Sequence, residues 1–144
     1  MNRVLLDTNV VLDALLERHP WVVEAKTIWA AHLDYRIAAH ITATSLTDIF
    51  YLSRRLVDRT RAWIAVGTCI DQLYILPVGL PVLQAAARIG DGDFEDHLQI
   101  TSAVAANLDA IVTRDGAGFR NSPISVLTPA QLIAQLIPMA PGNV

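Results

Sequence analysis

A short apolar run near the N-terminus, which ends in an aspartate, constrains the fold of this chain more than any other stretch. The Val-Leu-Leu segment at residues 4–6 does not alternate polar with apolar residues, which is typical of a strand buried on both faces in a parallel sheet. Thr8 and Asn9 favour a helix N-cap, and the apolar residues after them predict a helix. We therefore expect Asp7 at the carboxyl end of a strand, the edge where open α/β sheets bind ligands. A capping or turn aspartate is the alternative explanation.

Apolar runs and segments of helical periodicity alternate along the rest of the chain. Strands are predicted over residues 4–6, 36–43, 74–78, 110–113 and 124–127, and helices over residues 10–16, 21–33, 44–52, 58–73, 81–89, 94–108 and 129–137. Residues 116–118 are expected to form a flexible loop. The alternation predicts an α/β fold with one domain over residues 1–137, in which a parallel sheet is covered by helices on both faces. Residues 138–144 are expected to be a flexible tail.

The predicted helix over residues 58–73 is expected to turn its large apolar residues toward the core. These residues are Trp63, Val66, Ile70 and Leu73. Their spacing is close to that of one helix face.

The composition favours a globular domain that has a partner. Hydrophobic residues make up 53% of the chain, and the mean hydropathy of +0.38 suggests apolar surface that a partner subunit or protein covers. The apolar runs are far shorter than the ~20 residues that cross a bilayer, and no signal peptide is visible. A single cysteine, Cys69, excludes an internal disulfide. We therefore expect a cytoplasmic protein with no membrane contact.

The charged residues argue against a broadly basic surface for nucleic acid, because the net charge is −3. The basic residues are nonetheless unusual, with ten arginines and a single lysine, Lys26. Arginine suits bidentate phosphate contacts better than lysine does, and four of the arginines lie within residues 54–61. A solvated corner between two helices is the alternative explanation for that cluster.

Five aspartates are expected to converge at one edge of the predicted sheet. Asp7 and Asp115 follow predicted strands, whereas Asp48, Asp93 and Asp96 lie in the first turns of predicted helices. Right-handed crossovers bring the carboxyl ends of all parallel strands to the same edge. Each of the three helical acids also fits a capping role, but capping leaves Asp7 and Asp115 unexplained.

A cluster of carboxylates favours a divalent cation. Like charges in one cleft repel each other and raise each other's pKa values unless a cation lies between them. Carboxylate-rich sites with only oxygen ligands suit Mg²⁺ or Mn²⁺, which retain waters for substrate phosphates. The pattern therefore predicts metal-assisted hydrolysis of phosphodiester bonds. His97, beside Asp96, is expected to be a surface or packed residue, and Asp13 a solvated acid.

Four parts of the chain carry a family resemblance, and together they cover essentially its whole length. They are residues 5–13, residues 43–51, residues 93–96 with 111–115, and residues 122–129. These segments resemble those of PIN-domain nucleases, in particular a VapC-type bacterial branch. The resemblance implies a parallel sheet of about five strands, commonly ordered 3-2-1-4-5, with an acidic pocket for Mg²⁺ or Mn²⁺. It also implies an endoribonuclease that a cognate antitoxin holds inactive.

The resemblance implies a role for each acid. Asp7 and Asp96 match the central metal ligands. Asp48 stands at the second acidic position, where many relatives have glutamate, and Asp115 at the fourth, where some have asparagine. These four residues are the expected catalytic and metal-binding set.

The resemblance also implies supporting residues around the metal. Thr113 matches a hydroxyl residue beside the pocket, and Asn9 matches a polar residue that orients the first aspartate. Asp93 is an extra acid that either caps a helix or supports a ligand. Gly118 stands where this branch often has an acid just before Phe119, so the resemblance implies weaker binding of a second metal ion.

Arg54 and Arg55 lie about two helical turns beyond Asp48, so we expect them to flank the cleft and contact RNA. Surplus apolar residues on the same predicted helix suggest a two-fold homodimer. The leading hypothesis is a metal-dependent endoribonuclease, the toxin of a toxin–antitoxin pair. The alternatives are a nuclease on DNA or flap structures and a non-catalytic PIN-like module that binds protein. A phosphotransfer receiver domain would need a lysine late in the chain, and Lys26 is misplaced for that role.

Overall fold

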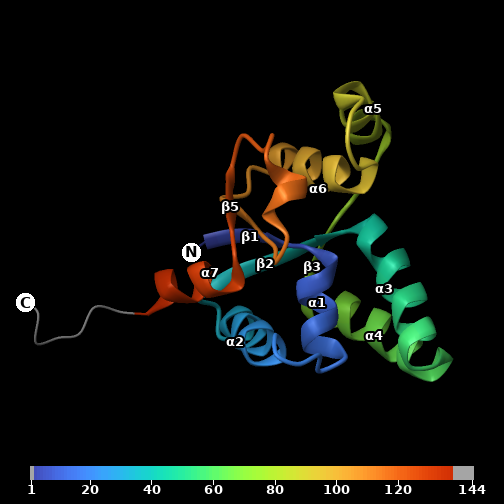
Figure 1. The fold of residues 1–144 in the computed structure, drawn as a ribbon, viewed down its shortest axis with the longest axis vertical. Helices are drawn as coiled ribbons and strands as arrows, with labels where there is room; N and C mark the ends of the chain where they lie inside the picture. The colour runs from blue at the N-terminus through green and yellow to red at the C-terminus, as the bar shows by residue number, and fades with distance from the viewer. Residues whose placement is uncertain (1, 138–144) are drawn as a thin grey trace, which may run out of the picture.

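A five-stranded parallel sheet in the order β3-β2-β1-β4-β5 forms the centre of the computed structural model, which describes residues 2–137 (Figure 1). The strands are β1 (Asn2–Leu6), β2 (Ile37–Thr42), β3 (Tyr74–Leu76), β4 (Ala110–Val112) and β5 (Ser125–Leu127). In the middle of the sheet, Leu5 of β1 pairs with His40 of β2 and with Ile111 of β4. The predicted fold and strand order are confirmed, whereas the predicted tail, residues 138–144, lies outside the described residues.

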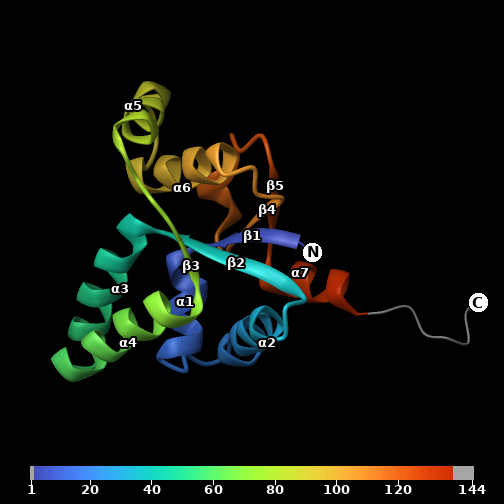
Figure 2. The same ribbon diagram turned by 180° about the vertical axis from the view of Figure 1, so that it is seen from behind.

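Helices cover both faces of this sheet (Figure 1, Figure 2). They are α1 (Thr8–Leu15), α2 (Val22–Leu33), α3 (Ala43–Leu56), α4 (Arg59–Gln72), α5 (Leu80–Ile89), α6 (Phe94–Ala105), the 3-10 helix η1 (Gly116–Phe119) and α7 (Pro129–Leu136). Helix α6 covers one face, with η1 beside it and α5 packed on it. Helices α1, α2, α4 and α7 lie on the other face, and α3 packs against α4 as a hairpin that projects beyond the sheet.

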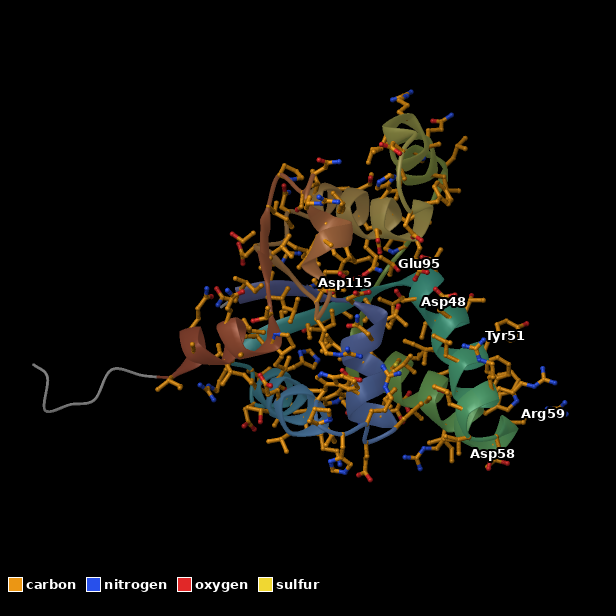
Figure 3. All side chains as sticks on the ribbon, in the orientation of Figure 1. Asp48, Tyr51, Asp58, Arg59, Glu95 and Asp115 are labelled. Atoms are coloured by element: carbon orange, nitrogen blue, oxygen red, sulfur yellow. The ribbon has the colours of Figure 1, made fainter. Side chains whose placement is uncertain are left out.

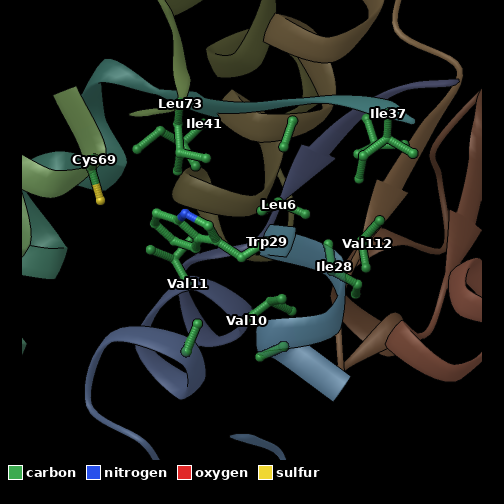
Figure 4. Packing of buried hydrophobic residues seen from close by; sticks show 14 of the residues in the cluster. Leu6, Val10, Val11, Ile28, Trp29, Ile37, Ile41, Cys69, Leu73 and Val112 are labelled. Carbon is green, nitrogen blue, oxygen red and sulfur yellow. The ribbon is translucent and has the colours of Figure 1, made fainter. Parts of the chain in front are cut away.

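The side chains of β1 alternate between two cores on opposite sides of the sheet. Val4 and Leu6 enter the larger core, where Trp29 of α2 also packs (Figure 4). Leu5 enters the smaller core with Phe119 of η1. All three β1 side chains are buried, so the prediction of a strand buried on both faces is confirmed.

The inward face of α4 differs from the prediction. Trp63 and Ile70 are 64% and 55% exposed, so their predicted place in the core is wrong. Several stripes of α4 are apolar, and small side chains allow its closest approach to the core. Trp63 instead packs against Phe50 of α3, with 4.9 Å between the ring centroids. The buried residues of α4 and its C-cap are Ala62, Ala65, Cys69 and Leu73, the last as predicted.

Several element boundaries differ from the sequence prediction, and α3 in particular continues to Leu56 rather than ending at residue 52. Residues 116–118, expected as a flexible loop, belong to η1, because the buried Phe119 anchors this segment in the smaller core. Helix α6 ends at Ala105 rather than Leu108, since Asn107 adopts a φ of 55° and the Leu108 amide bonds back to the Ala103 carbonyl at 2.9 Å. Within residues 2–137, no helix has the length and apolar character needed to cross a membrane.

Candidate metal and active site

An acidic cleft of about 510 Å³ lies at the carboxyl edge of the sheet, where β1 leads into α1 and β2 into α3. The first turn of α6 forms its third side. Its lining residues are Asp7, Thr8, Asn9, Leu12, Arg18, Asp48, Tyr51, Leu52, Asp93, Glu95, Asp96, Gln99 and Arg114. Asp48, Glu95 and Asp115 gather near this edge in Figure 3. The structure therefore brings four of the five predicted acids into the lining of one cleft, and Asp115 lies beside it.

Asp7 is held at the end of β1 by hydrogen bonds from three elements. Its carboxylate accepts from the Thr8 amide at 2.7 Å, from Thr113 Oγ1 at 2.7 Å and from Gln99 Nε2 at 3.1 Å. The side chain is buried, with 8% of the residue exposed. Donors on α1, α6 and the end of β4 thus fix the direction in which the Asp7 carboxylate points.

Asp93 and Asp96 stand in the first turn of α6, and Asp93 is the N-cap of this helix. The Asp96 amide donates to Asp93 Oδ1 at 3.1 Å. Burial and, to a lesser extent, the negative charges of Asp93, Asp7 and Asp115 raise the pKa of Asp96 to about 6. Asp96 therefore lies close enough to these three acids for their charges to affect its protonation. His97 is buried, so it is a packed residue, one of the two expectations for it.

Glu95 is a site residue that the sequence analysis did not single out. It lines the cleft, and Thr8 Oγ1 lies 3.5 Å from its Oε1. Its pKa is raised to about 8 by burial first, and then by a hydrogen bond to Asp48 and by the charges of Asp48, Asp7 and Asp93. The only sequence signal is its position beside Asp96, which is also an ordinary place for an acid in the first turn of a helix.

Asp115 lies just past β4, and its amide donates to Thr113 Oγ1 at 3.0 Å. The residue is exposed at the start of η1. Three residues further along the chain, the backbone of Gly118 lies against the Asp96 side chain. A Cβ built at Gly118 would lie 2.2 Å from Asp96 Oδ2. Any side chain at Gly118 would therefore displace the Asp96 carboxylate.

The orienting role expected of Asn9 falls to other residues. Asn9 lines the cleft, but its buried Oδ1 has no hydrogen-bond partner within residues 2–137. Gln99, one helical turn after Asp96, is 1% exposed and donates to Asp7 instead. The side-chain oxygen of Gln99, Oε1, is also buried and has no partner in the described part of the chain. A polar residue on an inward-facing helix stripe was the available signal for Gln99.

The arginines that line the cleft are Arg18 and Arg114. Both bind the carboxylate of Asp13, which is 1% exposed, so the expectation of a solvated Asp13 is wrong. Arg54 and Arg55 are exposed in the last turn of α3. The cleft reaches only as far along this helix as Tyr51 and Leu52, so neither of these two arginines lines it.

The oxygen atoms that line the cleft are suitable ligands for a hard divalent cation. They are carboxylate, hydroxyl and amide oxygens, the ligands that Mg²⁺ and Mn²⁺ prefer. Burial, followed by the charges of the neighbouring acids, raises the pKa values of Glu95 and Asp96, and a cation in the cleft would offset the repulsion between these acids. The unpartnered oxygens of Asn9 and Gln99 are further acceptors in the same place. Among the described residues, no three His, Cys, Asp or Glu side chains stand close enough to bind one ion together as they lie.

Carboxylates at the end of β1 and on α3 and α6, gathered at the carboxyl edge of a parallel sheet, define an α/β domain built around an acidic cleft. The PIN domain family matches residues 3–117 of the sequence. The chain belongs to the PIN domain family, and the resemblance seen in its motifs is confirmed.

Individual relatives extend this likeness over most of the chain. Ribonuclease VapC1 of Aquifex aeolicus (strain VF5) is 26% identical over 134 residues, which cover 88% of this chain and 90% of the relative. The structure of Mycobacterium tuberculosis VapC20, described as a toxin that cleaves the sarcin-ricin loop, shares 13% identity with a TM-score of 0.71 and covers 82% of this chain and 94% of its own. The DNA-bound VapBC2 complex of Rickettsia felis gives 15% identity, a TM-score of 0.68, and coverage of 88% and 98%. The two structures establish the shared fold.

Proposed function

We propose that this chain is a divalent-metal-dependent endoribonuclease of the VapC type, the toxin of a toxin–antitoxin pair. One observation carries the proposal: Asp7, Asp48 and Asp96, from three separate elements, line one cleft at the carboxyl edge of a PIN-domain sheet. The relative from Aquifex aeolicus is named a ribonuclease, and the Mycobacterium tuberculosis structure is described as that of a toxin that cleaves the sarcin-ricin loop. RNA is therefore the substrate class that we assign.

Asp7 and Asp96 would hold Mg²⁺ or Mn²⁺, with Asp48 and Asp115 as further ligands. When bound, such an ion lowers the pKa of a coordinated water and stabilises charge on the scissile phosphate. Thr113 would support this set through Asp7, and Asp93 through the first turn of α6. Asn9 would offer its unpartnered oxygen to the same cleft.

The chain's own side chains orient the site and hold a proton in it. Thr8, Gln99 and Thr113 bind both oxygens of the Asp7 carboxylate and keep it directed into the cleft. Because its pKa is about 8, the Glu95 carboxyl group carries a proton at neutral pH and hydrogen-bonds to Asp48. A cation held in the cleft would lower this pKa, and the Glu95 carboxylate could then accept a proton from an attacking water. Hydrolysis of this kind leaves a 5′-phosphate and a 3′-hydroxyl.

An apolar groove between α3 and α4 fits a segment of the antitoxin. This α3–α4 groove has a volume of about 400 Å³ and is lined by Leu46, Thr47, Phe50, Tyr51, Trp63 and Val66. Trp63 is well exposed, as is Tyr51. Tyr51 lines the acidic cleft as well, so a segment bound in the groove would lie next to the site. Several similar structures are toxin–antitoxin complexes, which supports a cognate antitoxin as the partner.

Further apolar side chains on the same hairpin support a homodimer. Four apolar residues of the hairpin are each more than half exposed: Leu56, Val57, Ile64 and Ile70. Exposed apolar side chains that gather on one part of a surface favour association. We propose a two-fold homodimer in the cytoplasm. Light scattering at high micromolar concentration should give the mass of a dimer, and a monomer would contradict this assignment.

An RNA cleavage assay with the purified chain tests the proposed function. We expect cleavage of RNA with Mg²⁺ or Mn²⁺, none with EDTA, and none by the Asp7→Asn variant with either ion. Single-stranded DNA and flap substrates belong in the same assay, because faster cleavage of either would assign the activity to DNA. A folded wild-type chain that leaves all of these substrates intact would overturn the nuclease assignment and favour a protein-binding module.

A further inference from the structure

One buried carboxylate on α1 holds two arginines beside the acidic cleft. Asp13 is 1% exposed. Its Oδ1 accepts from Arg18 Nε at 2.9 Å, and its Oδ2 accepts from Arg114 Nε at 2.6 Å. Arg114 Nη2 adds a contact to Oδ1 at 3.4 Å. One negative charge thus binds two positive ones, which leaves a net positive charge at a fixed position.

The surroundings restrict both guanidinium groups further. Arg18 Nη2 donates to the carbonyl of Asn9 at 3.1 Å. The Arg114 guanidinium stacks on the ring of Trp21, with 3.8 Å from Cζ to the ring centroid. The two arginine side chains are only 28% and 24% exposed. Little conformational freedom therefore remains for them to lose when an anion binds.

Some donors of this pair remain available. Within residues 2–137, the hydrogen bonds of Arg18 and Arg114 involve Nε and Nη2, and neither Nη1 has an acceptor. Both arginines line the same cleft as Asp7, Asp48 and Asp96. The cleft therefore has carboxylates in one part and restrained guanidinium groups with free donors in another.

A polynucleotide needs such an arrangement. The acids repel backbone phosphates, so positive charge must hold the strand close to them. Planar guanidinium groups with fixed donors match phosphate oxygens in a bidentate way. An ion pair that only tied α1 to the end of β4 would not need to lie in the cleft or to include a second arginine.

We propose that Arg18 and Arg114 form a phosphate-binding pair that holds a backbone phosphate of the substrate strand, with Asp13 as the positioning residue for both. This inference rests on the proposed function, because it takes single-stranded RNA as the ligand. It assigns to the cleft a substrate-holding part that is separate from the acids.

Equilibrium binding in EDTA tests the pair without cleavage. A fluorescent single-stranded RNA would be titrated with the wild-type chain, with Arg18→Gln, with Arg114→Gln and with Arg36→Gln. The last is the matched control, since Arg36 is exposed and precedes β2 at the opposite edge of the sheet. We expect each cleft variant to weaken binding about tenfold, as loss of a charge-assisted contact does. The slope of log Kd against log salt concentration should fall by about 0.7 per lost contact. Equal binding by the cleft variants and the Arg36 variant would overturn the proposal, as would a wild-type chain that binds no RNA.

Asp13→Asn distinguishes positioning from simple electrostatics. Removing a negative charge should strengthen RNA binding if only net charge matters. If Asp13 positions the arginines, the variant should bind RNA several-fold more weakly although it is more positive. Tighter or unchanged binding by a folded Asp13→Asn chain would remove Asp13 from the proposal.

Two controls cover variants that fail to fold. Arg114→Lys keeps the charge near Asp13 but loses the planar fork, and it should recover only part of the wild-type affinity. In the wild-type chain, the Nε–H signals of Arg18 and Arg114 in nitrogen-correlated NMR spectra should shift on addition of RNA. Unmoved signals at saturating RNA would contradict the pair. RNA that is bound through these arginines but never cut with Mg²⁺ or Mn²⁺ would instead contradict the proposed nuclease function and leave the binding pair supported.

Discussion

Glu95 of α6 lies next to Asp48 of α3 in the acidic cleft. Burial is the largest cause of the raised pKa of Glu95, and a hydrogen bond to Asp48 together with the charges of the neighbouring acids brings this pKa to about 8. Two carboxyl groups can be joined in this way only if one of them is protonated. The two residues come from helices on different sides of the sheet and lie close together in Figure 3.

The stability of the metal-free protein should fall as pH rises toward 8. Glu95 keeps its proton in the folded state up to about pH 8, whereas its ordinary pKa is 4.5, so between these values the folded state binds more protons. Asp96 acts with the same sign between 3.8 and about 6. We expect the Tm in EDTA to fall by about 3 °C from about pH 5 to about pH 8, as measured by calorimetry. Glu95→Gln should flatten this dependence, and Glu24→Gln, outside the cleft, should not. A Tm that rose over this range in wild-type protein would contradict the raised pKa values of Glu95 and Asp96.

Removal of single acids should separate activity from folding. Asp7→Asn and Asp96→Asn should each reduce the rate of RNA cleavage by at least about a hundredfold, because each removes an anionic ligand and changes little volume. Asp115→Asn should have a smaller effect, since Asp115 is exposed beside the cleft. Single-turnover cleavage and Tm should be measured together, with Asp71→Asn as the control for loss of an exposed acid. Near-normal cleavage by a folded Asp7→Asn chain would show that the site is assigned wrongly.

Divalent ions should stabilise the fold and release protons on binding. Millimolar Mg²⁺ or Mn²⁺ should raise the Tm by mass action, and the Asp7→Asn/Asp96→Asn double variant should lose this gain. At pH 7 the ion should displace the proton of Glu95, because that group is protonated below about pH 8. Calorimetric titration of Mn²⁺ in buffers of different ionisation enthalpy measures the protons released. Binding heats that are independent of the buffer would argue that the ion does not reach Glu95.

The close approach of Gly118 to Asp96 predicts an asymmetric effect of two alanine substitutions. Gly118→Ala would place a Cβ within 2.2 Å of Asp96 Oδ2, so the carboxylate must rotate away. The protein should remain folded and lose about tenfold in Mn²⁺ affinity. Gly116→Ala is the matched control, because no atom lies within 4 Å of its added Cβ. Equal ion affinity in the two variants would contradict a role for this contact.

The arginines at the end of α3 should contribute to RNA binding more weakly than those of the cleft. Arg54→Ala with Arg55→Ala should reduce RNA affinity a few-fold and lower the salt dependence, because both side chains are exposed and free to shift. Mn²⁺ affinity should not change. RNA affinity equal to that of wild type over the whole salt range would remove these two residues from the RNA-binding surface.

Much of the fold could be predicted because the sheet leaves strong local signals. Residues 4–6 and 110–112 are uninterrupted apolar runs, and both prove to be strands buried on both faces. The face of α4 could not be predicted in the same way. The apolar residues of α4 occupy several stripes along the helix. In the structure the stripe of small side chains faces the core, and Trp63 and Ile70 are exposed.

The acids of the cleft were predictable from their places after strands and at helix starts, but their partners were not. Glu95 and Gln99 lie on the same helix as Asp96, and only the packing of α6 against the sheet shows which of their side chains reach Asp48 and Asp7. The sequence predicted a solvated Asp13 because its two arginine partners lie 5 and 101 residues away along the chain. Helical periodicity predicts side-chain contacts three or four residues apart, so it predicts neither of these two ion pairs.

The sheet divides the molecule into two cores of unequal size, and the cleft draws on both of them. Asp7 and Asp48 stand on elements that pack into the larger core, whereas Glu95 and Asp96 begin a helix anchored in the smaller one. Local opening requires less free energy where fewer apolar side chains are buried. Amide hydrogen exchange should therefore be faster in α6 than in β1, and each such opening would take the site apart while the rest of the domain stays folded. Catalytic competence would then be lost before the fold itself, as temperature or denaturant rises.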